Sequence, residues 1–255
     1  MANSRSGETV IERVDKILAV FTAHRPRLTA AEVADSSGLP SSTAHRLCGE
    51  LAQRGWLERD GGAYVVGTRL WELSTRSAQE SSLAAVATPF MQDAHAVLGQ
   101  HIQLGRRQGR EVLILQRLSA RGARSISSGV AGRLPLHVSA VGLILLAWMD
   151  PQAREGYLRD LHAAQESIPQ GTVTQLERIL AAIRSVGHTV QTGNVEPDRT
   201  AIAVPVRNHR GDVVAGLGAV LDRAEVSVDA EVTVQVLRAA AHGVERTLKR
   251  NGRPV

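Results

Sequence analysis

The sequence predicts an α+β protein with two domains joined by a helical connector. Its 255 residues, 43% of them hydrophobic, exceed what one ordinary domain needs and suffice for a small and a medium domain. Capping and turn signals near the start are typical of three short helices and a hairpin. Later, strand-like and helical runs mix without strict alternation, which favours an α+β domain. The predicted divisions are 1–70, 71–98 and 99–255.

Two capping boxes open the first two predicted helices. In residues 9–12 (Thr-Val-Ile-Glu) and again in 29–32 (Thr-Ala-Ala-Glu), the threonine and the glutamate are spaced to cap each other's backbone N–H. The first helix is expected to continue to His24, ahead of a proline. The second is expected to end near Gly38, because glycine readily adopts the left-handed conformation of a helix end.

Ser41 is predicted to cap a third helix that runs to about Arg54, before Gly55. At 100° per residue this helix has one apolar face and one small, polar face. The apolar face holds Ala44, Leu47, Cys48 and Leu51, and the polar face holds Ser42, His45, Arg46 and Gly49. The short turn before this helix makes a helix-turn-helix, an arrangement that places its second member in the major groove of DNA.

Residues 56–59 and 63–66 are interpreted as two short strands that form a wing. The polar face of the third helix predicts DNA binding, and a protein-docking winged helix is the alternative. Neutral charge favours the alternative a little, since nine basic and nine acidic side chains precede residue 76. The basic excess lies between Arg106 and Arg133, where strands with water-facing arginines are a simpler interpretation than a second nucleic-acid surface.

No pattern predicts an enzyme, a metal site or a membrane protein. The single cysteine, Cys48, excludes a disulfide framework and a multi-cysteine metal site, and is interpreted as a core residue. No nucleophile and base can be nominated together, so no catalytic residue or cofactor is expected. The longest apolar run, 141–149, is too short to cross a bilayer, and the first residues hold no apolar signal segment. We therefore expect a soluble, cytoplasmic protein without a membrane partner.

Residues 9–74 resemble the DNA-binding domain of IclR-type bacterial transcriptional regulators along their whole length. The matching segments are 39–47 (LPSSTAHRL), 54–59 (RGWLER) and 64–70 (YVVGTRL). The resemblance implies a homodimer, or a dimer of dimers, on a roughly palindromic double-stranded operator in the nucleoid. The implied DNA-binding residues are Thr29, Ser41, Ser42, Thr43, His45, Arg46, Arg59 and Tyr64.

A helical connector is predicted to start at Thr68 and to break or restart at Pro89. In the resembling family this segment is a linker helix that helps to pair two subunits. Beyond it, strands are expected near 101–104, 112–115, 201–206 and 213–221, and helices at 139–148, from a Thr174–Glu177 capping box, and near 232–248.

Residues 132–142 and 201–206 resemble the effector-binding domain of the same family, which is similar to a GAF fold with a mostly antiparallel sheet flanked by helices. By position, the resemblance implies a small-molecule pocket. Its residues are Ala140, Val141, Gln191, Ala201, Gly218 and Val220, with Pro135, Leu136 and His137 at its wall. His137, Gln191 and Asn194 are candidates for orienting a ligand, and a structural role in a turn or strand edge is the alternative for each.

This sequence departs from the family pattern around the expected pocket. Asn194 stands where glutamate is frequent, Asp198 where glycine is frequent, and Leu143 where lysine is typical. These changes favour a larger, aromatic or amide-like effector over a small keto acid. We therefore expect a ligand-responsive transcriptional repressor. A regulator that binds a protein partner and no metabolite is the alternative, and a filled, dry second domain would support it.

Overall fold

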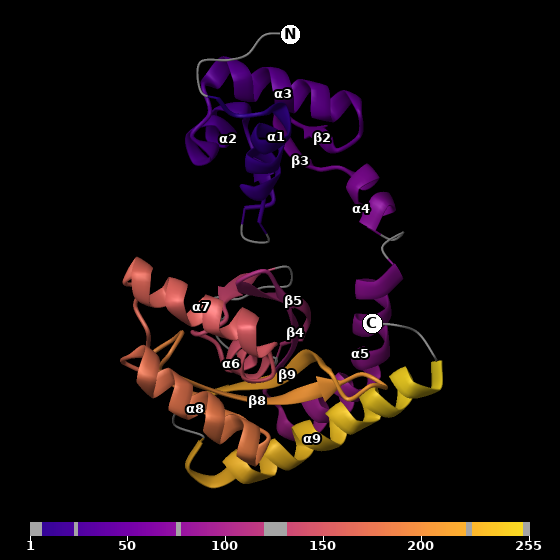
Figure 1. Cartoon of the computed structure of the whole chain (residues 1–255). Helices are drawn as coiled ribbons and strands as arrows, with labels where there is room; N and C mark the ends of the chain where they lie inside the picture. Colours follow the sequence, from indigo (N-terminus) through magenta and orange to yellow (C-terminus); the bar gives the residue numbers. More distant parts are fainter. Residues whose placement is uncertain (1–6, 23–24, 75–77, 120–131, 223–225, 252–255) are drawn as a thin grey trace. The chain divides into compact units, whose positions relative to one another are not determined.

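The computed structural model describes residues 7–22, 25–74, 78–119, 132–222 and 226–251 (Figure 1). The chain divides into two compact units, Met1–Ala78 and Gln79–Val255, which have separate hydrophobic cores. The predicted boundaries at residues 70 and 98 stay a prediction, and the division between the units lies inside the expected connector. Within the described ranges, no helix combines the length and the apolar character that crossing a bilayer requires.

The first unit is a winged helix-turn-helix, as the sequence predicts. Its elements are α1 (Val10–Ala19), β1 (Arg27–Leu28), α2 (Ala30–Ser37), α3 (Ser41–Gln53), β2 (Leu57–Asp60), β3 (Ala63–Val66) and α4 (Thr68–Ser74). The strands form an antiparallel sheet in the order β1-β3-β2. Both predicted capping boxes, at Thr9 and Thr29, are formed, and Gly38 ends α2 with a left-handed φ of 68°.

The end predicted for the first helix is wrong. α1 ends at Ala19 and does not continue to His24, which lies outside the described residues. Thr22 and Arg25 exchange backbone hydrogen bonds of 3.2 and 3.0 Å, so this part of the chain is paired as a bridge and is not helical. The short strand β1 that follows was not predicted.

The second unit is an antiparallel sheet covered by helices on both faces. Its elements are α5 (Ala78–Leu98), β4 (His101–Gln108), β5 (Glu111–Leu118), β6 (Arg133–Pro135), α6 (Ala140–Ala147), α7 (Pro151–Ala164), α8 (Val173–Val186), β7 (Thr189–Thr192), β8 (Arg199–Arg207), β9 (Val213–Asp222) and α9 (Val226–Asn251). The strand order is β6-β5-β4-β9-β8-β7. Helices α5 and α9 pack on one face, and α6, α7 and α8 share a core on the other (Figure 1).

The expected break at Pro89 is also wrong, because α5 is continuous through this residue. Pro89 and Ala85 are both exposed, so the carbonyl that loses its helical partner can bind water. The other side of α5 carries Leu83, Ala87 and Met91 into the core of the second unit. Most of the expected connector is therefore an integral helix of that unit.

Two predicted helix caps are displaced. Pro40 is the N-cap of α3 and Ser41 is its first residue, because the Pro40 carbonyl accepts the first backbone hydrogen bonds of the helix. α8 starts with a capping box between Thr172 and Gln175, two residues before the predicted pair. Helix α7 was not predicted, although Asp150 caps it and proline is its first residue.

Three glycines allow α6 to lie directly on the sheet. A Cβ atom added at Gly105, Gly216 or Gly218 would lie 3.0, 2.9 or 3.1 Å from a methyl carbon of Val141. These glycines lie on the neighbouring strands β4 and β9. Because no side chain stands between them and the helix, Val141 is fully buried and the first turn of α6 is fixed against the sheet.

Candidate functional site

The N-terminal half of α3 presents a polar face to solvent. Ser41, Ser42, His45 and Arg46 are exposed, and Thr43 is half-buried. The four residues of the opposite face lie in the core of the first unit, as the helical periodicity predicts. Because the core contacts only the apolar face of α3, its polar face stays available for base edges and phosphates.

Arg46 has only a surface partner. Its guanidinium lies 2.5 Å from the Glu50 carboxylate one turn along α3, and the two side chains are 57% and 45% exposed. Such an exposed pair contributes little to stability. The arginine can therefore exchange Glu50 for a DNA phosphate at small cost.

The wing places one of its two predicted DNA contacts in the core. Tyr64 is only 3% exposed, because β3 is paired on both sides and turns this ring inward. The exposed Arg59 guanidinium lies 5.4 Å from the centre of the Tyr64 ring. Tyr64 therefore supports Arg59 and does not present its ring to solvent. The Thr29 hydroxyl is exposed but is occupied by Glu32 in the capping box, at 2.8 Å.

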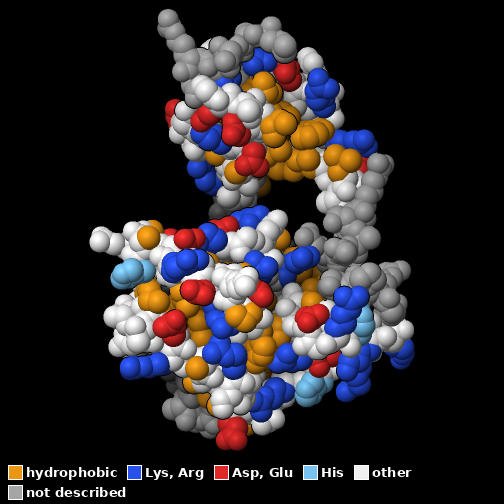
Figure 2. Space-filling model, in the orientation of Figure 1, with side chains coloured by type: hydrophobic (Ala, Val, Ile, Leu, Met, Phe, Trp, Pro, Cys, Tyr) orange, Lys and Arg blue, Asp and Glu red, His pale blue; other side chains and the backbone are white. Residues whose placement is uncertain are grey.

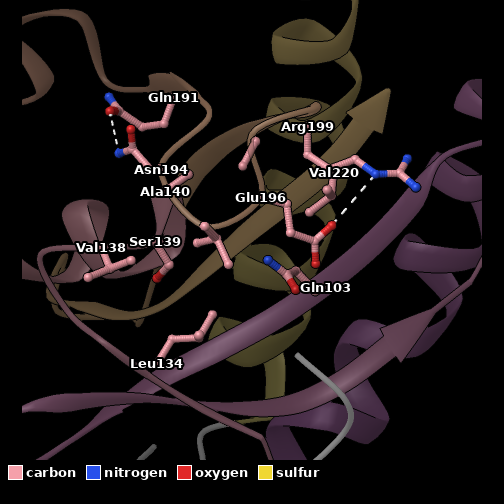
Figure 3. A pocket seen from close by; sticks show the side chains of 12 residues that line it. Gln103, Leu134, Val138, Ser139, Ala140, Gln191, Asn194, Glu196, Arg199 and Val220 are labelled. Carbon is pink, nitrogen blue, oxygen red and sulfur yellow. Dashed lines mark hydrogen bonds and ion pairs between the residues drawn. The ribbon is translucent and has the colours of Figure 1, made fainter. Parts of the chain in front are cut away.

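A pocket opens in the second unit between the start of α6, the sheet and the segment that joins β7 to β8 (Figure 3). The space between its lining atoms amounts to about 450 Å³, which includes open solvent at its mouth. Its lining residues are Gln103, Leu134, Val138, Ser139, Ala140, Gln191, Asn194, Val195, Glu196, Arg199, Ala201 and Val220.

The α6 end of this pocket is polar but uncharged. The Ser139 hydroxyl accepts a 3.0 Å hydrogen bond from the N–H of Gly142 and so caps the helix. The N–H groups of Ala140 and Val141 precede the first helical hydrogen bond and are the kind that binds anions. The side-chain amide of Asn194 donates to the Gln191 side chain at 2.9 Å, which ties β7 to the following segment.

The sheet end of the pocket is charged. Arg199, 8% exposed, lies 3.7 Å from the Glu196 carboxylate and 3.8 Å from that of Asp222. Gln103, 4% exposed, lies on β4 opposite Arg117 of β5, so both side chains are on the same face of the sheet. Burial lowers the pKa of Arg117, and the negative charge of Glu196 opposes this shift. Two arginines and two carboxylates therefore balance at this end.

His137 is held in a buried hydrogen-bonded group beside the pocket. Its Nδ1 lies 2.8 Å from the Tyr157 hydroxyl, and its Nε2 lies 3.2 Å from the Ser167 carbonyl. A carbonyl only accepts, so Nε2 carries the proton and Nδ1 accepts from Tyr157. Burial lowers the pKa of His137, which favours this neutral form, although the Ser167 carbonyl opposes the shift. Arg110 covers the Tyr157 ring at 4.5 Å.

Two family models together match most of the chain. The model described as "Bacterial transcriptional regulator IclR C-terminal" matches residues 75–246, and the model described as "IclR helix-turn-helix domain" matches residues 10–61. The chain belongs to the IclR family. It is a transcriptional regulator with a helix-turn-helix and an effector domain, and not an enzyme. In the described part of the chain, no cluster of three or more His, Cys, Asp or Glu side chains is placed to hold a metal ion.

Curated and solved relatives agree with this assignment. The transcriptional regulator KipR of Bacillus subtilis is 28% identical over 76% of this chain and 78% of its own. A crystal structure of an IclR homolog complexed with 4-hydroxybenzoate, from Microbacterium hydrocarbonoxydans, is 37% identical with a TM-score of 0.84 and covers 95% of this chain and 100% of its own. An IclR homolog from Microbacterium sp. strain HM58-2 is 35% identical, covers 95% and 98%, and has a TM-score of 0.59.

Half of the ten predicted effector-binding residues line the pocket. These are Ala140, Gln191, Asn194, Ala201 and Val220. The others lie nearby but face elsewhere. Leu136 and Val141 are buried in the α6 core, Gly218 makes room for Val141, Pro135 is exposed on β6, and His137 bonds Tyr157. A displacement by one residue along α6 or β6 is enough to turn a side chain away from the pocket.

The charged end of the pocket was missed by the sequence prediction. Arg199 lies two residues before the predicted Ala201 on β8, and side chains at this spacing share a face of a strand. That alternation is a signal that identifies Arg199 from the sequence. Gln103 carried no such signal, because its place opposite Gly218 depends on the β4–β9 pairing.

Proposed function

We propose that this regulator is a repressor that binds a palindromic operator as a homodimer and leaves it when a small aromatic acid enters the pocket. The observation that carries the proposal is the combination of an exposed polar recognition face on α3 with a formed pocket whose two ends are polar. An effector acts only through unequal affinity for DNA-competent and DNA-incompetent states. The protein would act in the bacterial cytoplasm, on nucleoid DNA.

The proposed DNA surface is the exposed face of α3 together with Arg59 of the wing. Ser42 and His45 are short, polar and accessible, which suits contacts with base edges. Arg46 and Arg59 provide charge for the phosphate backbone. We propose that Ser41 and Thr43 lie at the edge of this contact, with Thr29 at the start of α2 close to the backbone.

The pocket favours an aromatic acid for three reasons. Its apolar walls, which include Leu134, Val138 and Val220, suit the faces of a ring. The N-terminus of α6 suits a carboxylate. The positive and negative charges at the sheet end cancel, and this end suits a second polar substituent on the ring. A relative 37% identical to this chain was crystallised with 4-hydroxybenzoate, which supports this class of ligand.

The homodimer is supported by apolar side chains that the first unit leaves exposed. Trp71 and Leu73 of α4 are 69% and 37% exposed, and Val66 at the end of the wing is 49% exposed. Figure 2 shows a group of apolar side chains on the surface of this unit. Large apolar groups that gather on a surface mark interaction sites. We propose that α4 pairs with α4 of a second copy, which would bring two α3 helices to two half-sites.

The test is fluorescence anisotropy of the full chain with the intergenic DNA upstream of its own gene. Binding is expected at submicromolar protein, with two symmetric half-sites protected from cleavage, and added 4-hydroxybenzoate is expected to raise the dissociation constant at least about fivefold. Trp71→Ser should yield a monomer by sedimentation and weaken binding. If the anisotropy of the DNA does not change on addition of the protein at low salt, DNA binding at this operator is contradicted. If the acid makes the protein bind DNA more tightly, release of DNA by the effector is contradicted.

A further inference from the structure

The guanidinium of Arg117 has one buried edge without an acceptor. Its Nε and Nη2 atoms are buried and have no hydrogen-bond partner among the described residues. These two nitrogens form the edge of a guanidinium that can bind both oxygens of a carboxylate in parallel. Buried donors are nearly always paired, so a buried edge of this kind indicates an acceptor from outside the chain.

This edge lies beside the lining of the pocket. Arg117 is directly opposite Gln103 in the pairing of β4 with β5, so the two side chains are on the same face of the sheet. Gln103 and Glu196 line the pocket, and the negative charge of Glu196 acts on Arg117. Figure 3 shows Gln103 and Glu196 at one end of the pocket, away from Gln191 and Asn194. Arg117 is therefore adjacent to the sheet end of the pocket, although it is not one of the lining residues.

The carboxylates of the chain at this end pair with a different arginine. Glu196 lies 3.7 Å and Asp222 lies 3.8 Å from the Arg199 guanidinium. Neither forms a hydrogen bond with Nε or Nη2 of Arg117. Burial lowers the pKa of Arg117, and the charge of Glu196 offsets this shift only in part. An anionic group on this edge would supply both the missing acceptor atoms and the missing negative charge.

We propose that the effector carries a second carboxylate, which binds the Nε–Nη2 edge of Arg117. The inference rests on the aromatic-acid effector proposed above, and it makes that effector a dicarboxylic acid. A carboxylate fits because its two oxygens accept both N–H groups and its charge compensates the buried cation. Glu196 is a like charge at the same end, so Arg117 and Glu196 have opposite effects on this carboxylate.

Calorimetric titration of the full chain with four probes tests this assignment. The probes are benzoate, 4-nitrobenzoate, isophthalate and terephthalate. The nitro group has two oxygens arranged as in a carboxylate but no net charge, and the two diacids place the second carboxylate at different positions of the ring. The better-bound diacid is expected to bind at least about tenfold more tightly than benzoate or 4-nitrobenzoate, because a hydrogen bond to a charged group is worth more than one between neutral groups.

Arg117→Met removes the guanidinium and keeps an unbranched stem. It should reduce the preference for the better-bound diacid over benzoate to less than about threefold. The urea midpoint of the ligand-free chain should stay the same or rise, because an incompletely compensated buried charge is removed. A damaged fold would instead lower the midpoint and the affinity for all four probes. Arg117→Lys, which keeps the charge but lacks the two-nitrogen edge, should retain only part of the preference.

Two further variants test the charges around this edge. Glu196→Gln removes the like charge, so the better-bound diacid should bind at least about threefold more tightly than to the unchanged chain, a gain that a damaged protein cannot show. Arg107→Met is the matched control. It removes an exposed positive charge from the other end of β4, outside the pocket lining, and should change the affinity for each probe by less than about twofold.

The outcomes separate this inference from the proposed function. If none of the four probes binds, the carboxylate site at Arg117 is wrong, and the operator titration with 4-hydroxybenzoate tests the aromatic-acid effector independently. If the probes bind but neither diacid is preferred, or if Arg117→Met weakens all four alike, the effector class stands and the role of Arg117 is wrong. If 4-nitrobenzoate binds as tightly as the better-bound diacid, the edge takes a neutral acceptor and the second carboxylate is wrong.

Discussion

The recognition face of α3 and the charged end of the pocket use similar side chains in opposite surroundings. Arg46 pairs with Glu50 on the exposed surface, and the mostly buried Arg199 pairs with the half-buried Glu196 and the half-exposed Asp222. In the first setting a charge can change partners freely. In the second, each charge depends on its neighbours because the unpaired state is costly. The charge on the exposed face of α3 is thus open to exchange of partners, whereas the charges at the sheet end of the pocket are held by one another.

The largest difference between the two regions is expected in how a glycine-to-alanine substitution within a helix changes the free energy of unfolding. A Cβ atom at Gly142 in α6 would lie 2.2 Å from the Leu136 carbonyl oxygen, whereas one at Gly49 in α3 would meet nothing closer than an arginine nitrogen at 3.8 Å. Gly142→Ala should lower the free energy of unfolding by about 3 kcal/mol. Gly49→Ala should raise it by up to about 1 kcal/mol. Urea unfolding followed by circular dichroism measures both, and equal effects would contradict the close contact of α6.

The next largest difference in stability is expected between alanine substitutions of the two arginines, Arg199 and Arg46. Arg199→Ala leaves Glu196 and Asp222 without their shared partner in a mostly buried place, and is expected to lower the free energy of unfolding by about 2 kcal/mol, less than for a fully buried pair because Asp222 is half exposed. Arg46→Ala should change it by less than about 0.5 kcal/mol. The same urea titration applies. A cost for Arg46→Ala as large as that for Arg199→Ala would show that exposure does not separate the two regions.

A smaller, pH-dependent difference is expected from His137. Its pKa in the folded protein lies below the ordinary 6.5, so the unfolded chain binds more protons once the pH falls through 6.5. The contribution of His137 to stability should therefore be constant above about pH 7 and should fall as the pH is lowered from 6.5 towards the folded pKa, by at most about 1.4 kcal/mol per pH unit. His137→Gln should flatten the profile between pH 5 and 6.5, a range above the ordinary pKa of glutamate. If the free energy of unfolding of this variant still falls with pH as steeply as in the unchanged chain, groups other than His137 cause the pH dependence.

Substitutions on the exposed face of α3 are expected to have the smallest effects on stability, but not on DNA binding. Arg46→Ala should reduce the slope of log affinity against log salt by about 1 and weaken binding to all DNA sequences alike. His45→Ala should instead change which bases are preferred, with a similar salt slope. Anisotropy titrations on an operator and on a scrambled duplex, at three salt concentrations, distinguish the two. Unchanged binding in both variants would remove the proposed recognition face.

Local signals predicted structure well where the nearby chain alone decides it. The boxes at Thr9 and Thr29 formed because a capping box needs only four consecutive residues. The faces of α3 followed from helical periodicity. The signal failed for α8, where Thr172 with Gln175 and Thr174 with Glu177 have the same spacing. The helix starts at the earlier pair, and the sequence pattern alone cannot choose between the two.

The pocket was predictable only in part, because its residues come from strands far apart in the chain. The family resemblance located the start of α6 and the β7–β8 segment, which include Ala140 and Asn194. Gln103 and Arg117 are brought to the same face by the pairing of β4 with β5, and a bulge after Leu104 shifts that register by one residue on one strand. Strand order and register decide this end of the site, and neither follows from local composition.

The glycines beneath Val141 have a consequence for redesigning the sensor. Because even one added methyl group at Gly105, Gly216 or Gly218 would press on α6, the sheet side of the pocket near this helix cannot be reshaped by small steps. The β6 wall and the β7–β8 segment carry no such limit, since Leu134 is only half-buried and Val195 is exposed. Libraries that seek biosensors for new small molecules should therefore vary those two segments and leave the glycines unchanged.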